Sequence, residues 1–348
     1  MAIVAIDCGT TNTRVYVVDH QGRIIGKGTR KVGVKDTSAT GSTETLGKGL
    51  QKAFADAIAD AGLDERAIEL IISSGMITSE IGLKTIPHLQ APVSCDDLAK
   101  NIVPVGSLDI FPEGIPVYFI PGVRNHSMSD RSDFSQVGML DFMRGEETQI
   151  AGILSSRMMT PPFTLAMLSS HTKYVSVDVD GKIAGSITTL SGQVFELLST
   201  YSVIAKSLKE DDTKAPEDFS QTVVDSAYKW TRRVGILRSF LMPRFLDVLM
   251  DTHWYDRRTF LEACIATEDI LALQQFEKLG MEMQTPFLLM GKPNRCKIYH
   301  YLLENKIKIV HPLTIVSDDE MVDSLTVQGL VYIARKANLI DKKELIHV

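Results

Sequence analysis

The chain has 348 residues, 44% of them hydrophobic and 23% charged, and it carries a net charge of −6. This composition is typical of an ordinary globular protein, and the length exceeds what one core usually fills, so two domains are expected. The acidic balance, without a basic run, argues against a nucleic-acid partner or an anionic membrane surface.

The first half predicts strands, then a helix, then further strands. Three strands are expected at 2–7, 13–19 and 23–30. Thr43 can cap a helix over about 44–61, in which apolar side chains fall on one face. The apolar runs at 67–74 and 116–121 predict two buried strands.

The second half repeats this order after a break at 158–162 (MMTPP), where we place the domain boundary. The predicted domains are therefore 1–158 and 159–348. A long, mostly helical region is expected between 191 and 280. The other elements expected here are strands near 163–168, 173–179, 182–188, 288–290 and 307–310, a helix at about 293–304, and a last helix that follows Ser317.

No secretion signal, membrane anchor or cysteine-based site is indicated. The first apolar run is interrupted by Asp7 and lacks a basic flank, and no uncharged apolar stretch approaches the roughly 20 residues of a membrane span. The four cysteines lack CxxC spacing and the eight histidines do not cluster. A cytoplasmic protein without a disulfide framework or transition-metal site is expected.

The opening stretch of the chain recurs, in weakened form, 159 positions later. The seven identities are Thr13/Thr172, Val18/Val177, Asp19/Asp178, Gly22/Gly181, Ile24/Ile183, Gly26/Gly185 and Thr29/Thr188. A period of half the chain is too long for a solenoid repeat, whose unit has about 20–50 residues. We therefore expect two similar α/β domains that place their first turns on one cleft.

The first of these turns has the chemistry of a phosphate loop. Its candidate cofactor-binding residues are Gly9, Thr10, Thr11, Asn12 and Arg14. Backbone N–H groups and hydroxyls in such a loop can surround phosphate oxygens, and Asp7 can hold a hydrated Mg²⁺ beside them. An ordinary hairpin turn is the alternative interpretation.

The second turn offers donors and a cation but no acid, at Ser170, His171, Thr172 and Lys173. This asymmetry suits an ATP cleft, in which one loop carries the metal and the γ-phosphate and the other binds the remaining phosphates. His171 can instead stabilise its own loop. Gly291, where a strand opens into a helix, is a candidate contact for the adenosine or a simple helix start.

Several segments together resemble the 2-dehydro-3-deoxygalactonokinase family, which belongs to the actin/hexokinase, or ribonuclease H-like, architecture. The matching segments are DCGTTNTR (7–14), SSGMITSEIGLKTIPH (73–88), IPGVR (120–124), DFMRGEETQIAGIL (141–154), SHTKYVSV (170–177), TTLSGQVFELL (188–198), LLMGKPNRCKIYHYLLE (288–304) and VQGLVYIARKA (327–337). The sequence departs from the family around 168–174, at 191–193 and at Lys292, all on the nucleotide side.

The resemblance implies an ATP-dependent sugar-acid kinase that uses Mg²⁺ and phosphorylates the 6-hydroxyl of 2-dehydro-3-deoxy-D-galactonate. It implies substrate contacts at Gly75, Met76, Arg124 and Arg144. A kinase for another sugar acid and a non-catalytic sugar-acid or nucleotide sensor are the alternatives. The implied partners are the sugar acid and ATP, and a homodimer is left open.

A kinase of this kind needs one group to accept the hydroxyl proton. Asp141, Glu146 and Glu147 are the candidates, and Asp141 is favoured because it lies where a strand or loop is expected to turn into a helix. Arg144 suits the carboxylate of the sugar acid, since its planar guanidinium can bind bidentately. The alternative for this segment is a helix start whose acids complement the helix dipole.

Overall fold

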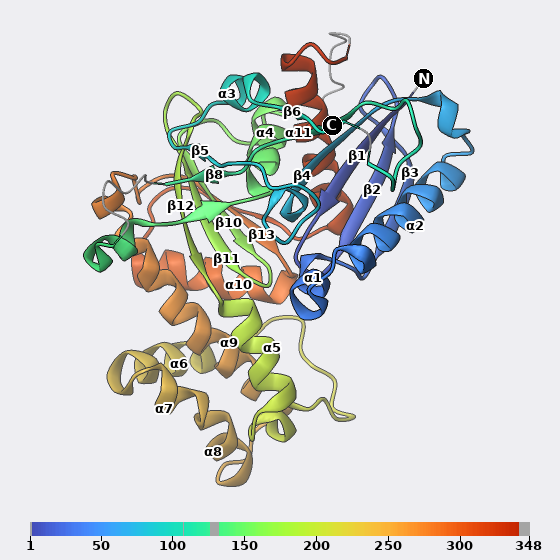
Figure 1. The fold of residues 1–348 in the computed structure, drawn as a ribbon. Helices are drawn as coiled ribbons and strands as arrows, with labels where there is room; N and C mark the ends of the chain where they lie inside the picture. Colours follow the sequence, from blue (N-terminus) through green and yellow to red (C-terminus); the bar gives the residue numbers. More distant parts are fainter. Residues whose placement is uncertain (1, 107, 126–131, 341–348) are drawn as a thin grey trace. The chain divides into compact units, whose positions relative to one another are not determined.

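The computed structural model describes residues 2–106, 108–125 and 132–340 (Figure 1). The chain forms two compact units. The first comprises Met1–Pro161, Val177–Ser186 and Asp319–Val348, and the second comprises Pro162–Ser176 and Ile187–Asp318. The first break lies close to the boundary expected at 158, but the last helix and residues 177–186 belong to the first unit.

The first unit is built on a six-stranded sheet with the order β3-β2-β1-β4-β7-β6. Its strands are β1 (Ala2–Cys8), β2 (Thr13–Val18), β3 (Ile24–Arg30), β4 (Ile68–Gly75), β6 (Val103–Pro104) and β7 (Val117–Phe119). Strand β1 pairs antiparallel with β2 and parallel with β4, and β4 pairs parallel with β7. A smaller sheet joins β5 (Leu89–Gln90), β8 (Val123–Arg124) and β9 (Phe142–Met143).

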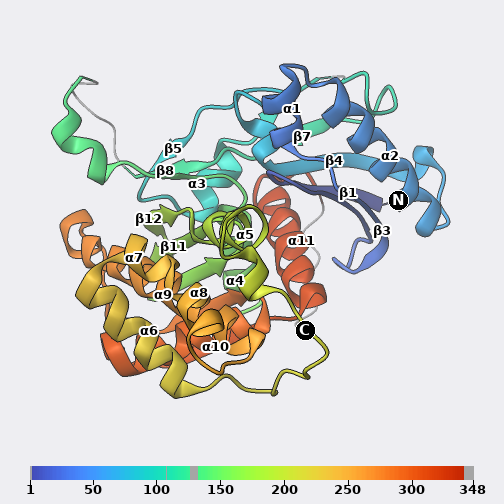
Figure 2. The ribbon, with the colours of Figure 1, turned by 90° about the horizontal axis from the view of Figure 1, so that it is seen from below.

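The helices of the first unit are α1 (Val34–Thr40), α2 (Glu44–Asp60), α3 (Cys95–Lys100), α4 (Glu146–Ser155) and α11 (Asp319–Lys336), with single 3-10 turns at Glu65–Ala67, Met76–Thr78 and Phe134–Met139. Helices α4 and α11 lie side by side (Figures 1 and 2). Glycines allow this approach, because a Cβ on Gly152 would lie 1.9 Å from the Leu325 carbonyl oxygen and one on Gly329 would lie 1.7 Å from that of Thr148.

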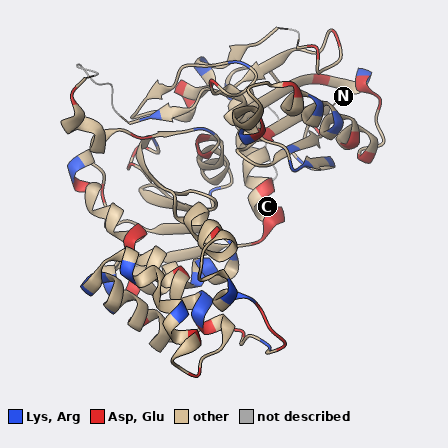
Figure 3. Cartoon of the chain, turned by 60° about the horizontal axis from the view of Figure 1, so that its bottom comes forward, with Lys and Arg blue, Asp and Glu red and all other residues tan. Residues whose placement is uncertain are grey.

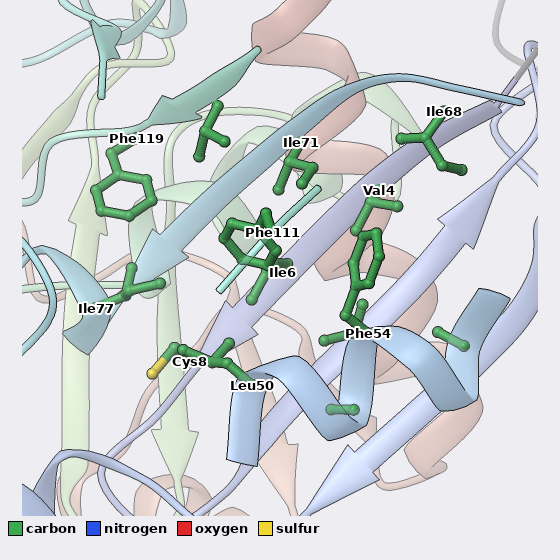
Figure 4. Packing of buried hydrophobic residues seen from close by; sticks show 14 of the residues in the cluster. Val4, Ile6, Cys8, Leu50, Phe54, Ile68, Ile71, Ile77, Phe111 and Phe119 are labelled. Carbon is green, nitrogen blue, oxygen red and sulfur yellow. The ribbon is translucent and has the colours of Figure 1, made fainter. Parts of the chain in front are cut away.

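The apolar face predicted for 44–61 is the face that α2 buries against the large sheet. Leu50 and Phe54 of this helix pack with Val4 and Ile6 of β1 (Figure 4). Phe54 also meets the ring of Phe111 edge-on at 5.6 Å. This core fixes the end of β1, where the first turn begins.

Most of a second, five-stranded sheet belongs to the second unit; its strand order is β12-β11-β10-β13-β14, and residues 177 and 183–186 of this sheet belong to the first unit. Its strands are β10 (Phe163–Leu168), β11 (Thr172–Val177), β12 (Ile183–Thr189), β13 (Phe287–Gly291) and β14 (Leu313–Val316). The order repeats β3-β2-β1-β4-β7, and the parallel pairs β10–β13 and β13–β14 match β1–β4 and β4–β7. The internal repeat in the sequence is therefore a repeat of sheet topology.

The region expected to be helical between 191 and 280 is helical. Its helices, with the one that follows β13, are α5 (Ser191–Tyr201), α6 (Gln221–Val234), α7 (Ile236–Phe240), α8 (Met242–Val248), α9 (Trp254–Leu271) and α10 (Pro293–Leu302), with short turns at Ala205–Leu208, Ala272–Gln275 and Glu277–Leu279. Lys229, Arg232 and Arg233 on α6 are exposed. Figure 3 shows how Lys and Arg are distributed along the chain. Among the described residues, no helix is both long and apolar enough to cross a membrane.

The strand predicted at 307–310 is wrong. A π-helical turn over Leu303–Ile307 follows α10, and Lys308 ends it in the left-handed conformation with φ 61°. The Ile309 N–H then donates to the Leu303 carbonyl at 3.1 Å. Only Ile307 of the apolar run lies in this turn, the buried Ile309 follows it outside any element, and the strand is β14, a few residues later.

Candidate active site

The first predicted phosphate loop is a tight turn between β1 and β2. The Gly9 N–H donates to the Asn12 carbonyl at 2.8 Å and closes the turn. Behind it, the start of α1 packs directly on the loop, because a Cβ on Gly33 would lie 2.4 Å from the Thr10 carbonyl oxygen. Thr11 and Asn12 bond to each other through their side chains. The loop is thus held in shape by backbone contacts.

Asp7, next to the last residue of β1, is a largely buried carboxylate among other charges, with its side chain 19% exposed. Arg14 of β2 lies opposite it in register and donates to its Oδ2 at 3.1 Å. Burial raises the pKa of Asp7, Arg14 lowers it, and the nearby carboxylates of Asp323 and Glu146 raise it further. A carboxylate in this setting favours an additional cation beside it.

The sequence could not show that Glu146 lies near Asp7. Two glycines bring them together: a Cβ on Gly75 would lie 3.4 Å from Asp7 Oδ1, and one on Gly145 would lie 3.6 Å from the Gly75 Cα. Both glycines have positive φ, 87° and 115°. Glu146 is the first residue of α4, and its Oε2 is buried without a hydrogen-bond partner among the described residues. Met76 follows Gly75 in a single 3-10 turn.

Glu147, the residue after Glu146, is fully buried. Both of its carboxylate oxygens accept the Gly145 N–H, at 2.9 and 2.8 Å. Burial raises the pKa of Glu147 to about 8, the Glu146 charge adds to this, and Arg144 opposes it. Glu147 is therefore a cap for the start of α4 and the least suitable of the three candidate bases.

This pKa gives a test by pH. The unfolded chain releases the Glu147 proton near pH 4.5 and the folded protein retains it to about pH 8, so folding stability falls between these values. In the Glu147→Gln variant this slope should be lost, a difference on the order of a few kcal/mol at pH 9. Urea unfolding at pH 5, 6.5, 8 and 9 measures it, with the exposed Glu44→Gln as control. Parallel pH curves for variant and wild type would contradict the assignment.

Arg144, the predicted carboxylate ligand, is already engaged within the protein. Its Nη1 donates to Thr78 Oγ1 at 2.5 Å, and its Nη2 donates to the Ile86 carbonyl at 2.8 Å and lies 3.4 Å from His88 Nδ1. These contacts join the segment before α4 to the 3-10 turn at Met76–Thr78 and to the segment that follows this turn. Arg144 thus has a bracing role that the sequence did not reveal.

Arg124 lies on the small sheet and has no such partners. It pairs in register with Phe142 of β9 and with Gln90 of β5. Its Nε is buried, and across 2–106, 108–125 and 132–340 no hydrogen bond or ion pair of its guanidinium is found. A half-buried guanidinium without a partner is suited to an anionic ligand.

Asp141 does not lead into a helix, so this part of the prediction is wrong. It precedes strand β9, and α4 begins only at Glu146. The Asp141 carbonyl accepts the Asn125 N–H at 2.9 Å, and its Oδ1 accepts the Ser186 hydroxyl at 3.1 Å. The carboxylate is therefore engaged by Ser186, a residue that belongs to the same unit.

The second predicted loop connects β10 and β11. The Ser169 N–H donates to the His171 carbonyl at 3.3 Å, and Ser170 Oγ lies 3.3 Å from His171 Nδ1. Thr172 and Lys173 lie in β11, where both are buried. A Cβ on Gly291 would lie 2.6 Å from the Leu168 carbonyl oxygen, so the end of β13 packs closely on the end of β10.

Over residues 7–331 the sequence matches the 2-keto-3-deoxy-galactonokinase family. The chain belongs to this family. It is 25% identical over 217 residues to 2-dehydro-3-deoxygalactonokinase of Escherichia coli (strain K12), and 23% identical over 211 residues to a protein of Rhizobium meliloti (strain 1021) named as a probable 2-dehydro-3-deoxygalactonokinase. Each match covers 61% of this chain and 61% and 60% of the two relatives, less than two thirds of their length.

A solved structure from Sinorhizobium meliloti, named as a candidate 2-dehydro-3-deoxygalactonokinase, has the same fold. It superposes with a TM-score of 0.72 at 20% identity and covers 98% of both chains. The predicted actin/hexokinase-like α/β fold of this family is thus confirmed.

In this 2-keto-3-deoxy-galactonokinase family member, one side chain that contacts the second loop was not identified from the sequence. Arg295 of α10 donates to the Ser169 carbonyl at 2.9 Å and to Ser191 Oγ at 2.8 Å. Its Nε lies 3.1 Å from Glu262 of α9. The arginine is 126 residues away from Ser169 in sequence, and no local pattern signals such a contact.

Proposed function

We propose that the protein is an ATP-dependent kinase that phosphorylates the 6-hydroxyl of 2-dehydro-3-deoxy-D-galactonate. The family match over residues 7–331 supports this, together with the names of the two relatives. The observation that carries it is local: the end of β1 presents a largely buried carboxylate, Asp7, beside a tight Gly/Thr turn, with a second carboxylate, Glu146, close by.

The phosphates of ATP are proposed to bind at the two turns that the internal repeat produces. At the first turn, Asp7 would hold Mg²⁺, which supplies neutralisation of the phosphate charge when bound. The chemistry of the donors fits this ion: a partly exposed carboxylate whose pKa is raised by desolvation and by neighbouring acids is suited to a hydrated divalent cation. The second turn would contribute Ser170, His171 and Lys173.

Glu146 is the base that we favour, in place of Asp141. In the proposed step the hydroxyl oxygen forms a bond to the γ-phosphorus, the bond to the β–γ bridging oxygen breaks, and ADP keeps that oxygen with its electron pair. The hydroxyl proton passes to the Glu146 carboxylate. Its buried Oε2 has no hydrogen-bond partner among the described residues, whereas Asp141 uses an oxygen on Ser186.

The carboxylate of the sugar acid is proposed to bind Arg124. Both guanidinium nitrogens at the tip of Arg144 already donate within the protein, while Arg124 has no partner in the part of the chain that the structure describes. Arg144 then serves to hold its segment against Thr78 and Ile86.

A substrate without the carboxylate provides the test of this assignment. For the natural acid, Arg124→Met should raise KM by roughly tenfold to a hundredfold, the effect of losing a charged hydrogen bond of about 1.5–3 kcal/mol. For the corresponding 3-deoxy-2-ketose, in which a neutral hydroxymethyl group replaces the carboxylate, the variant and wild type should have similar KM. Steady-state kinetics with both substrates measure this.

Arg66, an exposed arginine of the same unit, gives the matched control in Arg66→Met. An equal rise in KM for both substrates would mean that Arg124 acts on something other than the carboxylate. If Arg144→Met instead showed the substrate-dependent loss, the carboxylate would have been assigned to the wrong arginine.

The function itself is tested by a coupled ADP-release assay over a panel of 2-keto-3-deoxy acids. Turnover with 2-dehydro-3-deoxy-D-galactonate above its epimers is the expected result. Turnover with a different acid would support the kinase for another substrate. Binding of the acid or of ATP by calorimetry without turnover would support the sensor.

Two further expectations concern the protein in the cell. We propose that it acts in the cytoplasm, where ATP is available, and a homodimer stays a prediction. Light scattering at micromolar concentrations, with and without ATP and Mg²⁺, measures the mass of the species present.

A further inference from the structure

Arg295 is a nearly buried arginine whose donors converge on the second loop. Its side chain is 10% exposed. Nη1 donates to the Ser169 carbonyl at 2.9 Å, and Nη2 lies within 3.2 Å of Thr172 Oγ1 and 2.8 Å of Ser191 Oγ. The two hydroxyls also bond each other at 2.6 Å. One guanidinium thus joins both ends of the loop to the start of α5.

These contacts fix the carbonyl groups of the loop. The Ser169 carbonyl accepts from Arg295, the Ser170 carbonyl accepts the Gln193 N–H at 2.8 Å, and the His171 carbonyl accepts from Ser169. A loop that binds an anion must keep its carbonyl oxygens away from it, because their lone pairs repel negative charge. Internal donors to all three carbonyls meet this requirement.

Arg295 is itself held by acids and a tyrosine. Its Nε lies 3.1 Å from Glu262 Oε1, although the two atoms are not aligned as a hydrogen bond. Tyr299 Oη lies 3.3 Å from its Nη2 and donates to Asp269 at 2.5 Å. Asp269 also accepts the Thr189 hydroxyl at the end of β12. The guanidinium is therefore held by contacts outside the loop as well as by the loop itself.

The loop, the start of α5 and Arg295 pack too closely for a side chain at Gly192. A Cβ on Gly192 would lie 2.0 Å from the Ser169 carbonyl oxygen and 2.8 Å from Arg295 Nη1. The first turn of α5 can approach the loop only because this residue has no side chain. A lysine at 295 could not reach the Ser169 carbonyl and the two hydroxyls at once, since it has a single nitrogen.

We propose that Arg295 is a positioning residue that holds the 169–173 loop in the shape that binds the phosphates of ATP. The proposal rests on the proposed function, because it takes the second loop to be a phosphate site. Nη1 and Nη2 of Arg295 donate within the protein and its Nε faces Glu262, so the residue acts through the loop and not on the ligand.

The experiment separates loop shape from folding by removing both charges together. Loss of Arg295 alone leaves Glu262 buried without a counter-charge, whereas a paired apolar replacement is often tolerated. Arg295→Met/Glu262→Leu should therefore fold, with KM for ATP raised roughly tenfold to a hundredfold, as expected when a binding group is displaced by about an ångström. KM for the sugar acid should change less than about twofold.

Arg295→Lys keeps a charge beside Glu262 and should show the same division between the two KM values. Arg238→Met is the matched control, because Arg238 also lies over an aromatic ring but is exposed on α7. If the paired variant fails to fold, Arg295→Lys decides. Unchanged KM for ATP in a folded variant overturns the proposal, and so does an equal rise in both KM values.

A loop variant distinguishes this failure from failure of the proposed function. His171→Ala/Lys173→Met should raise KM for ATP if the second loop binds phosphates. If it does and the Arg295 variants do not, only the positioning role is wrong. If the loop variant leaves KM for ATP unchanged, the second loop is not a phosphate site and the proposed function must be revised there.

Discussion

Replacing Asp7 with asparagine is expected to lower kcat by roughly a hundred- to a thousandfold while leaving the fold intact. Asparagine keeps the size of the side chain but removes the negative charge that would hold Mg²⁺ near the transferred phosphoryl group. Losses of this size accompany removal of one group that stabilises charge in a transition state. The measurement is kcat over a range of Mg²⁺ concentrations at saturating ATP and sugar acid.

The Mg²⁺ titration carries the sharper part of this test. A metal ligand should also shift the Mg²⁺ dependence, so the Asp7→Asn variant should require a higher concentration for half-maximal rate. Asp19→Asn is the matched control: Asp19 also closes a hairpin of the same sheet, but its partner is the exposed Arg23. Near-wild-type kcat with unchanged Mg²⁺ dependence in Asp7→Asn would exclude Asp7 from the metal site.

The stability of this variant has two opposing contributions. Burial and the carboxylates of Asp323 and Glu146 raise the pKa of Asp7, so the loss of its charge relieves an unfavourable interaction. Arg14 loses its partner in the same variant. Thermal unfolding should therefore shift by only a few degrees, and a collapse of the melting temperature would mean that activity was lost through the fold.

Elements whose signal is local were predictable from the sequence. The repeat between 10–29 and 169–188 became the matching strand orders of the two sheets. The periodic apolar face of 44–61 became the face of α2 that packs on β2 and β3 and shares a core with β1. Both signals, the repeated residues and the periodic apolar face, can be recognised along the chain without knowledge of the tertiary structure.

Contacts between distant segments were not predictable. Arg295 reaches Ser169 across more than a hundred residues, and Arg144 donates to Thr78 and to the Ile86 carbonyl. The apolar run at 307–310 contains one buried isoleucine, Ile309, and does not form a strand. Residue type gave the chemistry in each case, but only packing determines which partner is within reach.

The choice between Asp141 and Glu146 shows the same limit within one motif. Both are acids in the segment 141–149, and a helix through it would have put them on different faces. The structure has a strand at β9, a break at Gly145 with φ 115°, and a helix that starts at Glu146. The break turns Glu146 toward Gly75 and Asp7, while Asp141 bonds to Ser186.

Glu146→Gln should consequently lower kcat by about a hundred- to ten-thousandfold, with a small change in KM for the sugar acid, because a general base acts on the chemical step. Asp141→Asn, the matched control, keeps an oxygen for the Ser186 hydroxyl and should retain kcat within about tenfold. Single-turnover phosphoryl transfer measured by rapid quench isolates the chemical step from product release. If Asp141→Asn loses the chemical step and Glu146→Gln does not, Asp141 is the base, and the acceptor hydroxyl lies beside the small sheet instead of beside the first phosphate loop.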